Sequence, residues 1–269
     1  MNKEETEILS LIESHIKKGN ENLIEFAINL ITNLKKIISI DNLMYIIKEK
    51  LQEKNIYFIR HAEAEHNVLE HKYKGDFSKC NVYDPKLTEN GIKQTIYTIE
   101  KLKKEKIHFD SVFISPLTRT IQTYFLVKNY LNKEAHAYAT DFAKEVLSLC
   151  DKNKGKKLSD LKIELKNENI NLEYITKEFW WFDLGKFKDG ELEGNVNFSL
   201  RLRIFIFWLI FRPEKNILII SHSHVFNNLQ GRGIYNADLA KMDNKILFQK
   251  VLQFLYFENK PIIKKKHKK

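Results

Sequence analysis

The chain has 269 residues, of which 43% are hydrophobic and 30% are charged, and its formal net charge is +10. These values favour a globular protein over a disordered or membrane protein, and the length suits one α/β domain with an extension. The longest apolar run, IFIFWLIF at 204–211, is too short to span a bilayer. We therefore read it as a buried helix and expect no membrane span.

The positive charge is spread along the chain, because lysine recurs throughout together with Asn and Ile, as an AT-rich coding bias would produce. No nucleic-acid-binding motif accompanies it, so we do not expect a nucleic-acid partner. A positive field would instead attract a small phosphorylated, anionic substrate. The sequence predicts no particular oligomeric state.

The termini and cysteines bear on location. The chain begins MNKEETEILS, without the basic stretch and apolar core of a secretory signal, and Cys80 and Cys150 show no CxxC spacing. A reducing compartment and a cytoplasmic location are expected. The tail at 260–269 contains KKKHKK, which we interpret as a solvated terminus; a nuclear signal and a contact for an acidic surface are the alternatives.

Residues 2–53 carry apolar residues at helical spacing, interrupted at 19–20 and 39–41. This pattern predicts three short helices. No catalytic constellation occurs in them. We interpret residues 1–54 as a helical extension that packs on the following domain, which we place at 55–259, or on a partner.

Three short apolar runs then predict strands buried on both faces, as in a parallel sheet. They are IYFI at 56–59, SVFI at 111–114 and ILII at 217–220. Helical patterns lie between the first two runs and after the second. The order predicts an α/β fold with a doubly wound, mostly parallel sheet flanked by helices.

The helix predicted at 88–106 shows apolar residues on one face, namely Ile92, Ile96, Ile99 and Leu102. The helix predicted at 115–131 has Ser115 as its expected N-cap and Pro116 at its first position. The polar segment at about 132–198 is expected to be an insertion over the sheet, serving as a lid. It contains the aromatic cluster FWWF at 179–182, for which a buried position is the better expectation.

Polar side chains follow each predicted strand: Arg60 and His61, then residues 115–119, then residues 221–224. Ligands of open parallel sheets bind outside the carboxyl ends of the strands, so these groups are expected to meet. Arginine forks suit phosphate oxygens, and a neutral histidine can attack phosphorus. The start of the helix near Ser115 would add backbone N–H groups.

These residues carry a resemblance to the histidine phosphatase superfamily, which has the phosphoglycerate mutase-like fold. The Arg-His-Gly-Glu signature with a following Asn is similar to Arg60, His61, Ala62, Glu63 and Asn67. Three further motifs resemble PKLTENGIKQ at 85–94, SPLTRTIQT at 115–123 and SHSHVFNNL at 221–229. The four motifs occur in the family's order.

The resemblance implies a role for each matching residue. His61 would be the nucleophile that forms a phosphohistidine, and Arg60, Arg119 and His222 would bind the phosphoryl oxygens, with Asn67 completing the pocket. Phosphoryl transfer needs in-line positioning and charge neutralisation, which fixed cationic donors supply, so no cofactor or metal is implied.

A proton donor for the leaving group is implied in the segment after the third motif, where Glu145 lies. To donate, this carboxyl group needs a pKa raised by burial or by a negative substrate. Asp141 and Glu63 remain candidates.

The sequence departs from the family pattern in three places. Ala62 replaces the usual Gly, which would cause strain if the backbone needs a positive φ; Ala64 replaces a Ser or Thr; and Ser223-His224 replaces a glycine pair. A weakened enzyme or a pseudophosphatase that acts as a binding protein is therefore one competing hypothesis.

A metal site and a mutase activity are the remaining hypotheses. A metallohydrolase could bind zinc or iron through the residues His61, Glu63, His66, His222 and His224, but arginines would repel the cation and no tight HxxxH spacing is present. A phosphoglycerate mutase-like phosphotransferase is disfavoured, because AKEVLSLC lacks the arginine-rich run of mutases. The resemblance therefore implies a phosphatase, a phosphoric monoester hydrolase.

Overall fold

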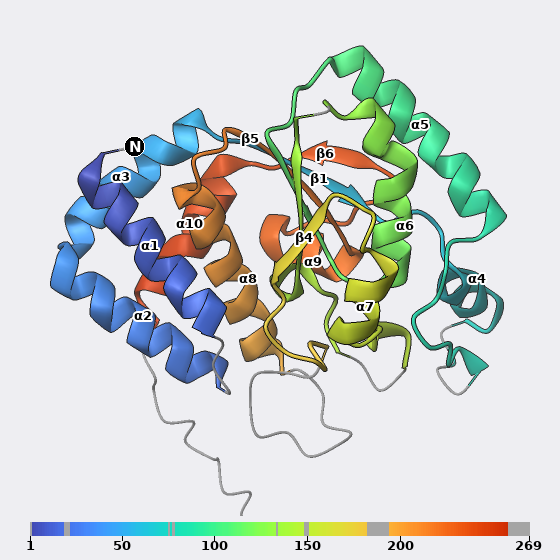
Figure 1. The fold of residues 1–269 in the computed structure, drawn as a ribbon, viewed down its shortest axis with the longest axis horizontal. Coiled ribbons are helices and arrows are strands. Elements are labelled where there is room, and N and C mark those ends of the chain that lie inside the picture. The colour runs from blue at the N-terminus through green and yellow to red at the C-terminus, as the bar shows by residue number, and fades with distance from the viewer. Residues whose placement is uncertain are drawn as a thin grey trace, which may run out of the picture.

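The computed structural model describes residues 2–18, 22–74, 76, 79–132, 134–147, 151–181 and 194–257. Its centre is a six-stranded sheet with the order β4-β3-β2-β5-β1-β6 (Figure 1). All described strand pairs are parallel except β1 with β6. The predicted mostly parallel sheet is thus confirmed. The strands are β1 Asn55–Arg60, β2 Ser111–Ile114, β3 His136–Thr140, β4 Ile170–Tyr174, β5 Asn216–Ser221 and β6 Leu239–Lys241.

Helices cover both faces of the sheet because successive side chains of a strand point to opposite sides. In β5, Ile217 and Ile219 join one hydrophobic cluster while Leu218 and Ile220 join the other. The first cluster includes α1 Lys3–Lys18, α2 Leu23–Ile37, α3 Ile40–Glu53, α8 Asn195–Phe211, α9 Ser223–Gln230 and α10 Asn244–Leu255. The second includes residues of α5 Glu89–Glu105, α6 Thr118–Val127 and α7 Leu158–Glu164. Helix α4, Glu65–Lys72, follows β1, and single turns of 3-10 helix are η2 Lys128–Tyr130, η3 Asp141–Ala143 and η4 Asp151–Asn153.

The three helices expected in residues 2–53 are present as α1, α2 and α3. The side-chain oxygens of Asn22 and Ser39 cap α2 and α3. The division into an extension, a domain and a tail stays a prediction, and the tail lies outside the described residues. Glu13 of α1 pairs with the buried Arg212 just after α8, at 3.0 Å between Oε1 and Nη1.

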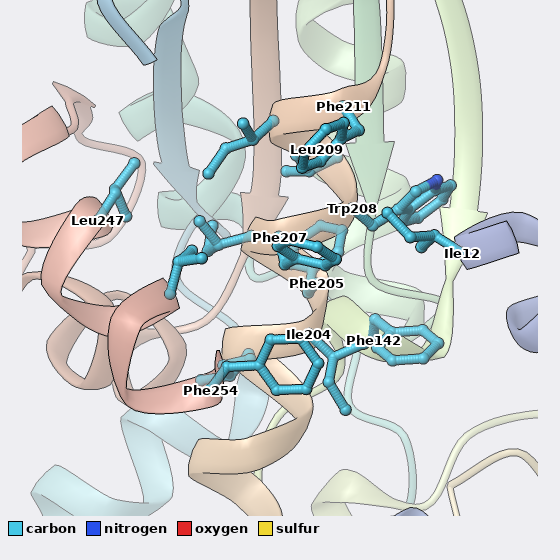
Figure 2. Close-up of a cluster of buried hydrophobic side chains, with 14 of the residues drawn as sticks. Ile12, Phe142, Ile204, Phe205, Phe207, Trp208, Leu209, Phe211, Leu247 and Phe254 are labelled. Atoms are coloured by element: carbon cyan, nitrogen blue, oxygen red, sulfur yellow. The ribbon is translucent and has the colours of Figure 1, made fainter. Parts of the chain in front are cut away.

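From residue 204 to 211, helix α8 is apolar around its whole circumference, and every one of these residues is fully buried. This part of the helix lies between the sheet and the helices α1, α2, α3 and α10, so no side of it faces water (Figure 2). A helix that is apolar all round requires such a position. The predicted buried helix at 204–211 is confirmed.

The helix expected at 88–106 is present as α5, but only part of its apolar face is buried. Ile92 and Ile96 are 48% and 56% exposed, whereas Gly91, Thr95 and Thr98 are buried with Leu102. A Cβ on Gly91 would lie 2.1 Å from the carbonyl oxygen of Glu63, so the helix approaches this backbone too closely for a larger residue. Close backbone approach, rather than apolar periodicity, therefore selects the inward face of α5.

The expected start of α6 was wrong. The N-cap is Leu117, not Ser115, and the helix begins at Thr118. Asp84 supplies the cap from another segment, since its carboxylate accepts from the Thr118 N–H at 2.9 Å and from the Thr118 hydroxyl at 2.6 Å. The positive end of this helix is thus already paired with a carboxylate.

The segment expected over the sheet at about 132–198 contributes strands β3 and β4 to one edge of the sheet. Trp180 and Trp181 of the aromatic cluster are buried, as expected, while Phe179 is 46% exposed. Phe182 lies outside the described residues. Whether any part of this segment acts as a lid stays a prediction.

Candidate active site

The carboxyl ends of three neighbouring strands meet, as the sequence predicted. Strand β5 lies between β1 and β2, with Arg60 paired to Ser221 and Ile114 paired to Ile220. The next residues therefore emerge side by side. The rings of His61 and His222, which follow β1 and β5, have their centroids 5.2 Å apart.

His61 is held in one tautomer. Its Nδ1 lies 2.8 Å from the carbonyl oxygen of Ala62, which can only accept, so Nδ1 carries the proton and Nε2 keeps its lone pair. Burial lowers the pKa of His61 well below the usual histidine value, and the charge of Arg119 lowers it further. His61 is thus a neutral imidazole with a free electron pair, the form that a nucleophile needs.

Ala62 does not strain this backbone. Among the described residues, the non-glycine positions with positive φ are Lys74, Asp84, Lys106 and Ala237, and Ala62 is not one of them. The Ala62 N–H donates to the hydroxyl of Thr123 at 3.1 Å. The missing glycine therefore has no conformational cost at this position.

Arg119 is fully buried beside the two histidines. Its Nη1 donates to the carbonyl oxygen of Lys152 at 2.8 Å, and its Nη2 donates to Asn153 Oδ1 at 2.9 Å and to His222 Nδ1 at 3.2 Å. Burial lowers the pKa of Arg119 to about 10, against the opposing charge of Glu145. The guanidinium therefore stays charged at neutral pH, and its Nε is buried without a partner.

His222 is fixed by two contacts. Because Arg119 can only donate to Nδ1, the proton of His222 lies on Nε2, which donates to the Ser115 hydroxyl at 2.7 Å. Burial lowers the pKa of His222 well below the usual value, with Arg119 adding to the shift. Ser115 is therefore a partner of His222 instead of the predicted helix cap.

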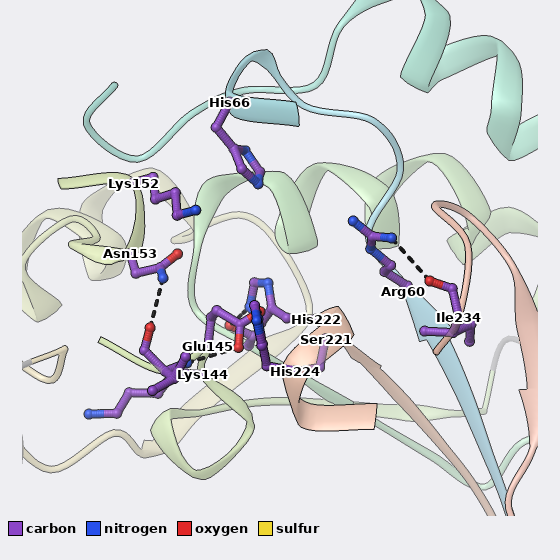
Figure 3. A network of polar contacts seen from close by, with 12 residues as sticks. Arg60, His66, Lys144, Glu145, Lys152, Asn153, Ser221, His222, His224 and Ile234 are labelled. Carbon is purple, nitrogen blue, oxygen red and sulfur yellow. Dashed lines mark hydrogen bonds and ion pairs between the residues drawn. The ribbon is translucent and has the colours of Figure 1, made fainter. Parts of the chain in front are cut away.

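Arg60 and Asn67 flank this centre. Arg60 Nη1 donates to the carbonyl oxygen of Ile234 at 3.0 Å, and Arg60 Nε is buried without a partner (Figure 3). The side-chain oxygen of Asn67 accepts from the Ala64 N–H at 3.1 Å, at the start of α4. Asn67 thus orients the segment that follows His61.

Glu145 follows η3 and contacts His224 (Figure 3). Its Oε2 lies 3.1 Å from His224 Nδ1, and its Oε1 accepts from the Val146 N–H at 2.9 Å. Burial raises the pKa of Glu145, but the bond to His224 and the charge of Arg119 outweigh it, and the net pKa is lowered. The carboxyl group is therefore ionised, contrary to the raised pKa that proton donation requires.

The two further candidate acids are placed differently. Both carboxylate oxygens of Glu63 accept hydrogen bonds from the start of α5, from the Thr88 hydroxyl at 2.7 Å and from Asn90 Nδ2 at 3.1 Å. Asp141 is buried at the end of β3, and burial raises its pKa to about 6. The carboxylate of Glu63 is thus hydrogen-bonded to the start of α5.

Part of the sequence is similar to a known protein family. Residues 56–141 match the family model described as histidine phosphatase superfamily (branch 1). This similarity covers less than half of the chain. That match includes Arg60, His61, Asn67 and Arg119, whereas Glu145 and His222 lie beyond it and are brought to the site by the fold.

Several known proteins are similar to parts of the chain. Phosphoglycerate mutase-like protein 1 of Arabidopsis thaliana is 25% identical over 209 residues, 66% of this chain and 72% of that protein. A probable phosphatase of Schizosaccharomyces pombe (strain 972 / ATCC 24843) is 31% identical over 71 residues, 26% of this chain and 30% of that protein. The ecdysone phosphate phosphatase of Bombix mori, solved with tungstate, shares 13% identity and a TM-score of 0.46 over 71% of this chain and 90% of that chain.

The site predicted from the sequence omitted three residues that contact it. Lys152 and Asn153 bind Arg119 from η4, and only a basic run after Glu145 hinted at them. His66 was considered only as a metal ligand. Its ring centroid lies 5.5 Å from that of His61, and its buried Nδ1 has no partner.

The metallohydrolase hypothesis required five side chains to gather. Within the part of the chain that the structure describes, no group of three or more His, Cys, Asp or Glu side chains is placed to hold a metal ion. Glu63 bonds to the start of α5, and His224 bonds to Glu145.

None of the helices in the described ranges is long and apolar enough to cross a membrane.

Proposed function

We propose that the protein is a metal-independent phosphomonoesterase that works through a phosphohistidine intermediate on His61. The observation that carries this proposal is the state of His61, a buried neutral imidazole with its Nε2 lone pair available beside Arg60 and Arg119. A neutral, oriented imidazole surrounded by cationic donors suits attack on a phosphoryl dianion.

Unpaired buried donors support an anionic substrate. Asn67 Oδ1 accepts from a backbone N–H, so its Nδ2 donates to His66 Nε2 at 3.1 Å, and the proton of His66 must lie on Nδ1. That Nδ1–H is buried without a partner, as are the Nε–H groups of Arg60 and Arg119. Buried donors without partners are costly, and phosphoryl oxygens would satisfy them.

In this mechanism, His61 Nε2 attacks phosphorus in line with the leaving oxygen. Arg60, Arg119 and His66 stabilise the charge on the equatorial oxygens. His222, whose ring nitrogens already bond to Arg119 and Ser115, holds Arg119 in place. The P–O bond breaks while Glu145 supplies a proton to the alkoxide. Water then attacks the phosphohistidine and releases phosphate. The substrate is a small phosphate monoester, and we place the reaction in the cytoplasm on the basis of the sequence.

The test is to trap the intermediate. The protein is mixed with p-nitrophenyl phosphate, quenched in base and analysed for an acid-labile phosphohistidine, with EDTA present throughout. We expect phosphate on His61 and turnover unaffected by EDTA. His61→Ala should abolish both signals, whereas His136→Ala, at the exposed start of β3, should leave them unchanged. Phosphorylation elsewhere, or loss of turnover in EDTA, would contradict the proposal.

A further inference from the structure

His224 lies in the first turn of α9, directly after β5 and His222. It replaces the second glycine of the pair that the family resemblance leads one to expect. Its Nδ1 lies 3.1 Å from Oε2 of Glu145, which comes from the loop after η3 (Figure 3). A substitution at one strand end has therefore given the candidate proton donor a titratable partner.

The two partners differ sharply in exposure. Glu145 is 8% exposed as a residue, whereas the side chain of His224 is 67% exposed. The carboxylate thus faces the protein interior and the imidazole faces water. A proton can reach the imidazole from solvent and reach the carboxylate through the hydrogen bond.

The surrounding charges decide where the proton lies. The charge of Arg119 acts on Glu145, while the charges of Lys152 and Arg60 act on His224. The hydrogen bond to Glu145 raises the pKa of His224, against burial and these two cations. The pKa of Glu145 is lowered and that of His224 is raised, so a proton shared by the pair lies on His224 and not on Glu145.

A carboxylate that is ionised at rest cannot by itself protonate a leaving alkoxide. We propose that His224 is the positioning residue that keeps Glu145 supplied with a proton, so that the two side chains act as one proton donor. The inference rests on the phosphomonoesterase function proposed above. It concerns only the source of the proton and leaves the nucleophile unchanged.

The proton balance of the cycle is simple. In the first step, the proton moves from His224 Nδ1 to the Glu145 carboxylate and on to the leaving oxygen, as the P–O bond breaks and the His61 Nε2–P bond forms. The pair is then without its proton. In the second step, Glu145 takes a proton from the attacking water as the new P–O bond forms, the P–N bond breaks, and the proton returns to His224.

The experiment compares two leaving groups in the intact protein. The leaving group of glycerol 2-phosphate is a basic alkoxide that needs a proton. The leaving group of p-nitrophenyl phosphate is p-nitrophenolate, which leaves without one. We expect His224→Gln to lower kcat/KM about tenfold or more for glycerol 2-phosphate and less than about twofold for p-nitrophenyl phosphate. A merely structural role would slow both substrates equally.

The pH profile gives a second readout. In the wild type, the pair keeps its proton up to the raised pKa of His224, so activity on glycerol 2-phosphate falls only above that pH. In His224→Gln, Glu145 alone must hold the proton beside Arg119, and the alkaline limb should move to lower pH. Asn227 is exposed in the same helix, so Asn227→Gln is the matched control. It should change neither the kcat/KM for either substrate nor the pH of the alkaline limb.

A double variant tests whether Glu145 and His224 act together. If the two residues act as one donor, Glu145→Gln and the combined Glu145→Gln, His224→Gln variant should be equally slow on glycerol 2-phosphate. Equal slowing of both substrates by His224→Gln, or an unmoved alkaline limb, would overturn this inference alone. A wild type that turns over neither substrate would overturn the proposed function and this inference together.

Discussion

The carboxyl ends of β1, β2 and β5 and the helix α8 are both deeply buried, but their burial has opposite effects. In α8, the residues from 204 to 211 remove apolar surface from water, which stabilises the fold. At the strand ends, burial removes water from His61, Arg119 and His222, which costs free energy and lowers the pKa of each group. One region supplies the stability, and the other uses it to hold charges and neutral imidazoles in position.

The largest effect is expected from the nucleophile. His61→Ala should lower activity on p-nitrophenyl phosphate by roughly a thousandfold or more, because no other group would form the intermediate. Thermal unfolding should change little, since the side chain contributes one hydrogen bond and lies in a cationic cluster. A large drop in melting temperature would show that the strand ends support the fold as α8 does.

The reverse behaviour is expected in α8. Trp208 is fully buried against Phe113 and Tyr174, so Trp208→Ala should lower the free energy of unfolding by about 3–5 kcal/mol. Denaturant unfolding measures this loss, and kcat per folded molecule should stay near the wild-type value. Val196→Ala, at a 58% exposed position of the same helix, is the matched control and should cost far less.

Gly91 tests whether the two regions are separable. Gly91→Ala places a methyl group against the Glu63 carbonyl, two residues from His61, and should destabilise the fold by about 1–3 kcal/mol. Because the displaced backbone carries the nucleophile, activity should fall as well. Asn90→Ala, the adjacent change, removes only an exposed hydrogen bond to Glu63 and serves as the control. Full activity in Gly91→Ala would mean that this backbone does not position His61.

The smallest effect is expected at Ala62. Its φ is not positive, so Ala62→Gly relieves no strain and should only add backbone freedom, at a cost of about 0.5–1 kcal/mol. We expect kcat on p-nitrophenyl phosphate to stay within about twofold of the wild-type value. A large gain in kcat would show that Ala62 narrows the pocket.

The lowered pKa of His61 predicts a broad acid range for the nucleophile. This pKa lies well below the usual value, so the imidazole remains neutral as the pH falls from neutral into the mildly acidic range. Activity on p-nitrophenyl phosphate, which needs no proton donor, should therefore persist in that range. A sharp loss near the ordinary pKa of histidine would contradict the described burial of His61.

Local sequence patterns determined much of this protein. Apolar runs of strand length predicted β1, β2 and β5, an all-round apolar run predicted α8, and polar residues after the strands predicted that Arg60, His61 and His222 would meet. These predictions succeeded because the spacing of apolar residues along a short segment indicates its secondary structure and its burial. They also succeeded because the carboxyl ends of parallel strands share one edge of the sheet. For α5, periodicity predicted the helix but not which face is buried, because the close approach of the backbone at Gly91 determines that face.

Only the tertiary structure decided the contacts between distant segments. Asp84 caps α6 in place of Ser115, Lys152 and Asn153 bind Arg119, and His224 reaches Glu145 across 79 positions of sequence. The ionisation of Glu145 depends on that last contact, because burial alone would have raised its pKa. The pKa of a buried group is set by the charges and donors that the fold brings around it, and spacing along the chain does not specify these.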